Sequence, residues 1–138
     1  MADTLKLEIV TPETTIYSED VEMVTLPGSE GEAGIYPNHV PLMTKVQAGE
    51  IIVNRGGTEE VVAIGEGFAE ITGDHIAILT DNAANSADID EAAAEEAKAK
   101  AEQRLEEGGD ISEEEAKALT QATLYSQAQI KAKRRKRG

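Results

Sequence analysis

Residues 26–42 read LPGSEGEAGIYPNHVPL and specify their backbone more tightly than any other part of this 138-residue chain. Three glycines and three prolines fall within the stretch. Because proline fixes φ and glycine permits positive φ, Pro27-Gly28 predicts a tight turn. Pro37 and Pro41 keep the short segment around His39 out of a helix. We expect a rigid, shaped loop on a β scaffold, where binding surfaces usually lie.

Apolar alternation on either side of this stretch predicts an antiparallel β-sandwich or barrel. Leu5, Leu7 and Ile9 alternate with more polar neighbours at a period of two, which is typical of a half-buried strand. Turn signals such as the Gly-Gly pair at 56–57 separate the later strands. These are expected at Glu22–Leu26, Leu42–Val46, Ile51–Asn54, Glu60–Ile64, Phe68–Thr72 and His75–Leu79.

After Asp81 the chain becomes rich in alanine and loses proline, which predicts helices. Asp88 with Glu91 three residues on resembles a capping box, and Gly108-Gly109 is a natural helix end.

A better capping box, Ser112 with Glu115, opens a second helix, and the short connection predicts an antiparallel hairpin. The predicted fold class is therefore α+β, with a sandwich at residues 1–84 and a helical hairpin at 85–138 that ends in a basic tail.

The hairpin offers little apolar surface for docking. One face of its first helix is predicted to carry Ala94, Ala97, Ala101 and Leu105, and one face of its second helix Ala116, Leu119 and Thr123. Burying one alanine methyl contributes only about 0.8 kcal/mol. We therefore predict a marginally docked hairpin that can undock or extend.

The net charge of −14 is unevenly distributed. The last eight residues hold six of the 13 basic groups and no acid, so residues 1–130 carry 7 basic against 27 acidic groups. This asymmetry indicates a tail made for an acidic partner or for folding back on its own acidic body; a solvated helix end is the simplest reading. The chain has no cysteine, no long apolar run and no visible export signal, so we expect a soluble protein without a transmembrane segment.

No residue pattern indicates an enzyme. His39 and His75 lack metal-binding spacing, so neither a metal nor a cofactor is expected. The glycines at 28–31 and 65–67 follow β segments without opening a helix, which favours turns or bulges over a phosphate-binding loop.

Four motifs in one order resemble the epsilon subunit of bacterial and chloroplast F-type ATP synthases. They are Leu-Pro-Gly at 26–28, Gly-Glu-x-Gly-Ile at 31–35, His-x-Pro-Leu at 39–42 and Gly-Glu-Gly-Phe-Ala-Glu at 65–70. The likeness runs from about Leu5 to the C-terminus. It implies a non-catalytic rotor subunit that links the gamma shaft to the ring of c subunits, at the cytoplasmic face of a bacterial inner membrane or the stromal face of a thylakoid.

By motif position, the resemblance implies that Glu32, Tyr36 and His39 lie towards the ring or the shaft. Glu66 replaces the second glycine of the family's Gly-Gly-Phe, which alters a local bulge. In the family, basic residues of the C-terminal helices engage acidic segments of the catalytic beta subunits and restrain ATP hydrolysis. The matching cations here are Lys131, Lys133, Arg134, Arg135, Lys136 and Arg137.

Some family members bind ATP through an Ile/Leu-Asp-x-x-Arg-Ala motif. This chain retains Ile89 and Asp90 but has Ala93 at the arginine position. Without a forked cationic donor for phosphate, ATP binding is expected to be weak or absent. The alternative function is a free-standing β-sandwich adaptor whose tail binds nucleic acid or an acidic regulator. The acidic body and the lack of aromatic platforms disfavour nucleic acid.

Overall fold

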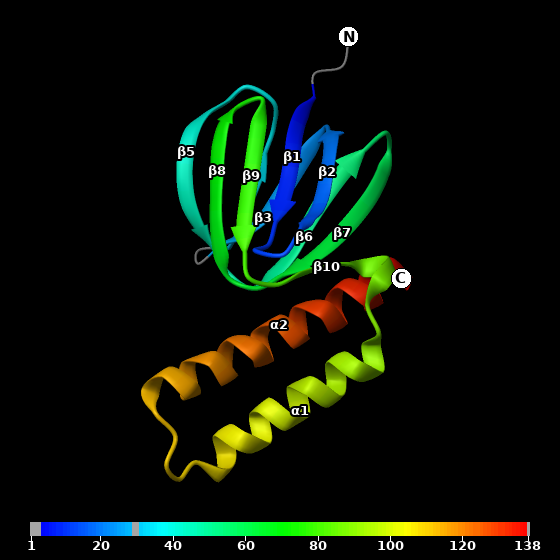
Figure 1. Ribbon diagram of the computed structural model, residues 1–138. Coiled ribbons are helices and arrows are strands. Elements are labelled where there is room, and N and C mark those ends of the chain that lie inside the picture. Colours follow the sequence, from blue (N-terminus) through cyan, green and yellow to red (C-terminus); the bar gives the residue numbers. More distant parts are fainter. Residues whose placement is uncertain (1–3, 29–30, 138) are drawn as a thin grey trace.

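Alternating burial along the first strand begins a β-sandwich that fills the upper part of the molecule (Figure 1). The computed structural model describes residues 4–28 and 31–137. In β1 (Leu5–Val10), Leu5, Leu7 and Ile9 are fully buried and the residues between them are half-buried. Successive side chains of a strand point to opposite faces, so one face of β1 enters the core as predicted.

The first sheet has five strands among the described residues, in the order β2-β1-β9-β8-β5. The other four are β2 (Thr15–Val21), β9 (His75–Thr80), β8 (Gly67–Gly73) and β5 (His39–Val46). Most pairs are antiparallel, but β1 and β9 run parallel. A parallel pair needs a long connection, and here the rest of the sandwich supplies it.

The second sheet, also five-stranded in the described part of the chain, has the order β10-β7-β6-β3-β4. It comprises β10 (Ala83–Asn85), β7 (Thr58–Ile64), β6 (Gly49–Arg55), β3 (Met23–Gly28) and β4 (Gly31–Ile35). Gly56 and Gly57 join β6 to β7 with φ of 58° and 80°. Two positive φ values in a two-residue loop match the hairpin turn that the Gly-Gly pair predicted.

The predicted turn at Pro27-Gly28 is wrong, because both residues belong to β3. Pro27 pairs with Glu32 and Gly28 with Gly31 across the β3–β4 ladder. Pro27 lies beyond the part of β3 that pairs with β6, so its missing N–H does not interrupt that ladder. Gly28 lets the backbones of β3 and β4 approach closely, since a Cβ there would lie 2.9 Å from the carbonyl oxygen of Gly31.

The core between the two sheets is aliphatic apart from Tyr17, in keeping with a chain that has one Phe, three Tyr and no Trp. Its fully buried members come from both sheets and include Leu5, Leu7, Ile9, Val24, Ile51, Val53, Val62, Ile64, Ile71, Ile76 and Ile78.

Below the sandwich, a short 3₁₀ turn, η1 (Ser86–Asp88), leads into α1 (Glu91–Glu107) and then α2 (Glu113–Arg137). The predicted cap at Asp88 is wrong, because η1 takes up that residue. The cap is Asp90, whose Oδ1 accepts from the Ala93 amide at 3.1 Å. The sequence correctly placed the end of α1, where Gly108 has φ of 60°, and the Ser112 cap, which accepts from the Glu115 amide at 3.0 Å.

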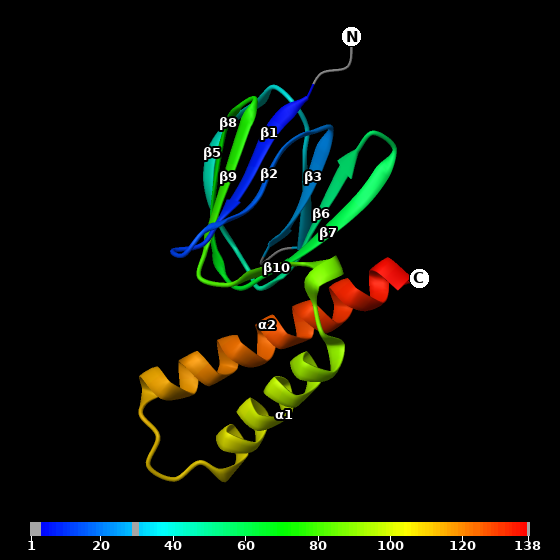
Figure 2. The ribbon, with the colours of Figure 1, turned by 45° about the vertical axis from the view of Figure 1, so that its right-hand side comes forward.

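The hairpin touches the sandwich through one helix, as both views show (Figures 1 and 2). The C-terminal half of α2 packs on β7, where Ala128 and Ala132 meet Val61 and Ala63 in a second small core. Helix α1 lies farther from the sandwich, against α2. The docking surface is therefore small.

The predicted face of α1 is correct except for one residue. Ala94 and Ala101 are buried and Leu105 is half-buried, but Ala97 is exposed. The inward residue is Lys98, which is half-buried, because the helical repeat of 3.6 residues favours 94, 98, 101 and 105. On α2, all three predicted residues (Ala116, Leu119 and Thr123) are half-buried.

Candidate functional site

Large apolar side chains cover part of the outer face of the first sheet. Phe68 and Leu79 are cross-strand partners in β8 and β9 and are 50% and 51% exposed. Met43 in β5 shares that face two residues along and is 67% exposed, and Val10 in β1 lies beside Leu79. We call Val10, Met43, Phe68 and Leu79 the apolar face. A contiguous exposed apolar surface of this kind marks an interaction site.

Sequence reasoning assigned these residues to strands but did not identify the apolar face. The signal was present in the alternation. Ala69 and Ile71 point into the core, so Phe68, next to Ala69 in the strand, points outward. Ile78 also points into the core, so its neighbour Leu79 points outward. An outward phenylalanine in a chain that has only one is the feature that identifies the surface.

The apolar face runs into an open groove between the sandwich and α2, with a volume of about 810 Å³. Phe68 and Leu79 line it together with Lys45 from β5 and Lys117 from α2. The groove thus joins an apolar wall to charged residues of both signs, because Glu66 and Asp81 line it as well as the two lysines.

The three residues predicted to face the ring or shaft lie around the β4–β5 connection. Glu32 is exposed on β4, an edge strand, and Tyr36 follows β4 with 61% exposure. They are four positions apart on extended chain, roughly 13 Å. His39 begins β5, pairing with Gly73, and its side chain lies outside the described part. The structure places all three in one region without bringing them into a single cluster.

The Gly65-Glu66-Gly67 segment is a structural connection held by one hydroxyl. Thr80 Oγ1 lies 3.2 Å from the Gly65 carbonyl oxygen and 3.0 Å from that of Glu66. A Cβ on Gly67 would lie 2.1 Å from the carbonyl oxygen of Leu79, so this position requires glycine. Glu66 is exposed, so replacing a glycine there leaves the close approach at Gly67 intact.

The basic tail folds back on the acidic body. Arg135 Nε lies 2.8 Å from Glu50 Oε2 on β6, and Arg134 bonds to Glu91 and Glu95 on α1 at 3.1 and 2.9 Å. The hydrogen bond to Glu50 is the main reason the pKa of Arg135 is raised, and the charges of Glu59 and Glu32 add to it.

Other tail residues complete this picture. Lys133 Nζ donates to the carbonyl oxygens of Ser86 and Ala87 in η1, at 3.3 and 3.5 Å. Lys131 is exposed. The side chains of Lys136 and Arg137 lie outside the described part.

The segment that resembles a nucleotide motif is used structurally. Ile89 is buried in the second core and Asp90 caps α1. Ala93 is exposed and has no side-chain donor. Arg134 lies beside the first turns of α1, but the carboxylates of Glu91 and Glu95 already bind its guanidinium.

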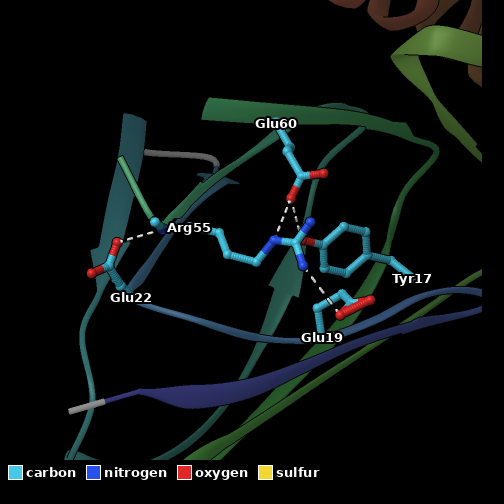
Figure 3. A network of polar contacts seen from close by, with 6 residues as sticks. Tyr17, Glu19, Glu22, Arg55 and Glu60 are labelled. Atoms are coloured by element: carbon cyan, nitrogen blue, oxygen red, sulfur yellow. Dashed lines mark hydrogen bonds and ion pairs between the residues drawn. The ribbon is translucent and has the colours of Figure 1, made fainter. Parts of the chain in front are cut away.

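A polar network joins β2 of the first sheet to β6 and β7 of the second (Figure 3). Tyr17 donates to Glu60 Oε1 at 2.7 Å, and Arg55 bonds to the same oxygen at 3.1 Å and to Glu19 at 3.2 Å. Burial, and then the hydrogen bond and charge of Glu60, raise the pKa of the Tyr17 hydroxyl. No local pattern predicts this network, because the contacts between β2 and the β6–β7 hairpin join residues 36 and 43 positions apart.

No arrangement typical of a metal or membrane-spanning site is seen in residues 4–28 and 31–137. Within these ranges, no three His, Cys, Asp or Glu side chains gather closely enough to hold a metal ion. His75 instead contacts Glu8 at 2.6 Å on the neighbouring strand. Neither helix, over its described residues, has the length and apolar composition needed to cross a bilayer.

Comparison with known proteins agrees with this architecture. The family model of the ATP synthase delta/epsilon chain β-sandwich domain matches residues 4–86. The ATP synthase epsilon chain of Desulforamulus reducens is 43% identical over 109 residues, covering 79% of this chain and 83% of that protein. The epsilon chain of Laribacter hongkongensis is 40% identical over 131 residues, covering 94% and 92%.

A solved structure shares the fold. A chain in the structure of the Euglena gracilis mitochondrial ATP synthase superposes with a TM-score of 0.74, covering 94% of this chain and 81% of its own length. At 21% identity, that likeness concerns the fold alone.

The β-sandwich with its helical hairpin, together with relatives named as ATP synthase epsilon chains, identifies a non-catalytic accessory subunit of an ATP synthase. The chain belongs to the epsilon-chain family of F-type ATP synthases. It is therefore a subunit of that enzyme complex.

Proposed function

We propose that this subunit links the gamma shaft to the c-ring and restrains ATP hydrolysis through its C-terminal hairpin. Residues 1–84 attach to the rotor and residues 85–138 regulate. The bacterial origin of the relatives described above supports a place at the cytoplasmic face of a bacterial inner membrane, or the stromal thylakoid face in a plastid.

The apolar face is the main observation that supports the proposed attachment to the gamma shaft. Full burial of a large apolar side chain contributes roughly 1.5–3 kcal/mol, and because Phe68 and Leu79 are about half exposed, a partner that covers them gains about half of that for each. The adjoining groove brings in Lys45 and Lys117, which add charge at the rim of the same surface. A shaft that buries this surface gains enough free energy for a stable attachment.

Glu32, Tyr36 and His39 are proposed as further rotor contacts. Glu32 and Tyr36 are exposed at the connection between the edge strands β4 and β5, where a ring or shaft can reach them. Aromatic side chains such as that of Tyr36 are enriched at protein interfaces.

Regulation is proposed to act through the tail cations, which engage acidic segments of the beta subunits. Their position at the end of a docked helix supports this, because undocking would carry them away from the body as a group. The alternative, a free-standing adaptor, has no support comparable to the family relationship.

Co-purification tests the attachment. Tagged subunit, expressed with the gamma subunit of its own synthase, should recover gamma in a 1:1 ratio. Recovery of the folded subunit without gamma would refute the proposed attachment.

A further inference from the structure

Three consecutive side chains near the C-terminus hold three different elements. Lys133 binds the carbonyl oxygens of η1, Arg134 binds the carboxylates of α1, and Arg135 binds Glu50 of β6. Sandwich, linker and hairpin therefore meet at one point of α2. The ion pair between Arg135 and Glu50 joins the hairpin to the sandwich at this point, so charge contributes to their arrangement here.

The contact between Arg135 and Glu50 ties the hairpin directly to the sandwich. Glu50 has a side chain only 12% exposed, and its carboxylate accepts from Arg135 at 2.8 Å. Glu32 and Glu59 lie near enough to favour the charged arginine further. A carboxylate this poorly solvated is costly to leave without its cation. The poorly solvated carboxylate of Glu50 therefore opposes the release of Arg135.

The other two contacts fix the angle of the hairpin. Lys133 holds η1, and Asn85 just before η1 donates to the Ile16 carbonyl oxygen at 3.4 Å, so the linker is tethered on both sides. Arg134 joins α2 to the first turns of α1 through Glu91 and Glu95. Opening the hairpin away from the sandwich must break the Arg135 contact first.

Apolar contact alone gives weak docking. The second core joins Ala128, Ala132 and the partly buried Tyr125 of α2 to Val61 and Ala63, with Ile89 beside them. Because the two alanines bury only one methyl each, this core leaves part of the docking to the ionic contacts, of which the Arg135–Glu50 pair is the least exposed.

We propose that these cations form a charge latch that keeps the hairpin docked, and that docking withholds them from any second acidic surface. The latch consists of Lys133, Arg134 and Arg135 with their partners Glu50, Glu91 and Glu95. The latch itself is a property of the isolated subunit. Its consequence for ATP hydrolysis rests on the proposed function.

Spin labels on the isolated, full-length subunit test the latch directly. The chain has no cysteine, so Glu66→Cys and Lys117→Cys place one label on each side of the groove. Glu50→Gln should shift the label distances towards longer values, raising the open-to-docked ratio roughly fivefold. Adding salt to the unchanged latch should move the distances in the same direction.

Two further variants separate charge from packing. Glu106→Gln removes the same charge from an exposed position on α1 and should leave the distances unchanged. Arg135→Glu alone should open the hairpin, and adding Glu50→Lys should restore docking. Distances that do not respond to Glu50→Gln, or a charge exchange that fails to restore docking, would overturn the latch.

The assembled synthase then tests the consequence. Glu50→Gln leaves every tail cation in place but frees Arg135, so it should lower ATP hydrolysis below that of the unmodified enzyme. If the labels show opening while hydrolysis is unchanged, the latch stands and the proposed restraint of hydrolysis is wrong.

Discussion

At the scale of single residues, Tyr17 links stability to alkaline pH. Its pKa is raised in the folded state by burial and by Glu60, so folding favours the protonated phenol. As pH rises above about 10, the unfolded chain ionises first and the unfolding free energy falls. Tyr17→Phe should therefore lose less stability over this range in chemical denaturation at several pH values.

Two other tyrosines serve as comparisons for this prediction. Tyr125 also has a pKa raised by burial, so some alkaline loss should persist in Tyr17→Phe. Tyr36 is exposed, and Tyr36→Phe should leave the pH profile unchanged. Identical profiles for Tyr17→Phe and the unmodified protein would contradict the account.

Gly67 offers a second test at this scale. A methyl group there would meet the Leu79 carbonyl oxygen at 2.1 Å, and backbone cannot move aside without disturbing the β8–β9 ladder. Gly67→Ala should lower the unfolding free energy by about 3 kcal/mol. At Gly65 the same methyl finds its nearest atoms at 3.6 Å, so Gly65→Ala should cost under about 1 kcal/mol in the same urea titration. Equal losses would mean that the close approach is not the cause.

At the scale of elements, the start of α1 argues against a nucleotide site. Asp90 is used as the helix cap, Ala93 supplies no donor, and Arg134 is paired with Glu91 and Glu95. Calorimetric titration of the isolated subunit with ATP should show no saturable heat. Tight, stoichiometric binding would show that other residues replace the missing arginine.

The elements also show what local sequence can predict. Strands with a clear period of two, such as β1 and β9, were predicted close to their observed bounds. The sequence analysis did not predict β2, β4 and β10, because β2 is largely polar, β4 contains two glycines and β10 has three residues. Such strands form because a neighbour supplies the hydrogen bonds.

The candidate surfaces were predicted to different degrees. The basic tail was visible as a charge run, but its partner Glu50 is 85 residues away. The apolar face was hidden among strand residues, since alternation identifies an outward side chain only after the inward ones are known. Pairing between distant segments leaves no local pattern.

At the scale of the whole molecule, removing the tail cations should change the rate of ATP hydrolysis in the opposite direction to Glu50→Gln. Replacing the six cations from Lys131 to Arg137 with glutamine removes the charges that engage beta-subunit acids, although it also opens the latch. ATPase activity of the assembled synthase should rise, and the difference from the unmodified enzyme should shrink as salt is added. Unchanged activity would remove the tail from regulation.

Attachment to the shaft through the apolar face is the central claim, and one matched pair of variants tests it most directly. Leu79 in the face and Leu124 on α2 are exposed leucines, at 51% and 40%. In calorimetric titrations against the gamma subunit, Leu79→Ser should weaken binding about tenfold or more, as loss of a buried interface leucine does. Leu124→Ser should leave the affinity unchanged. Equal affinities for both variants and the unmodified subunit would contradict the account.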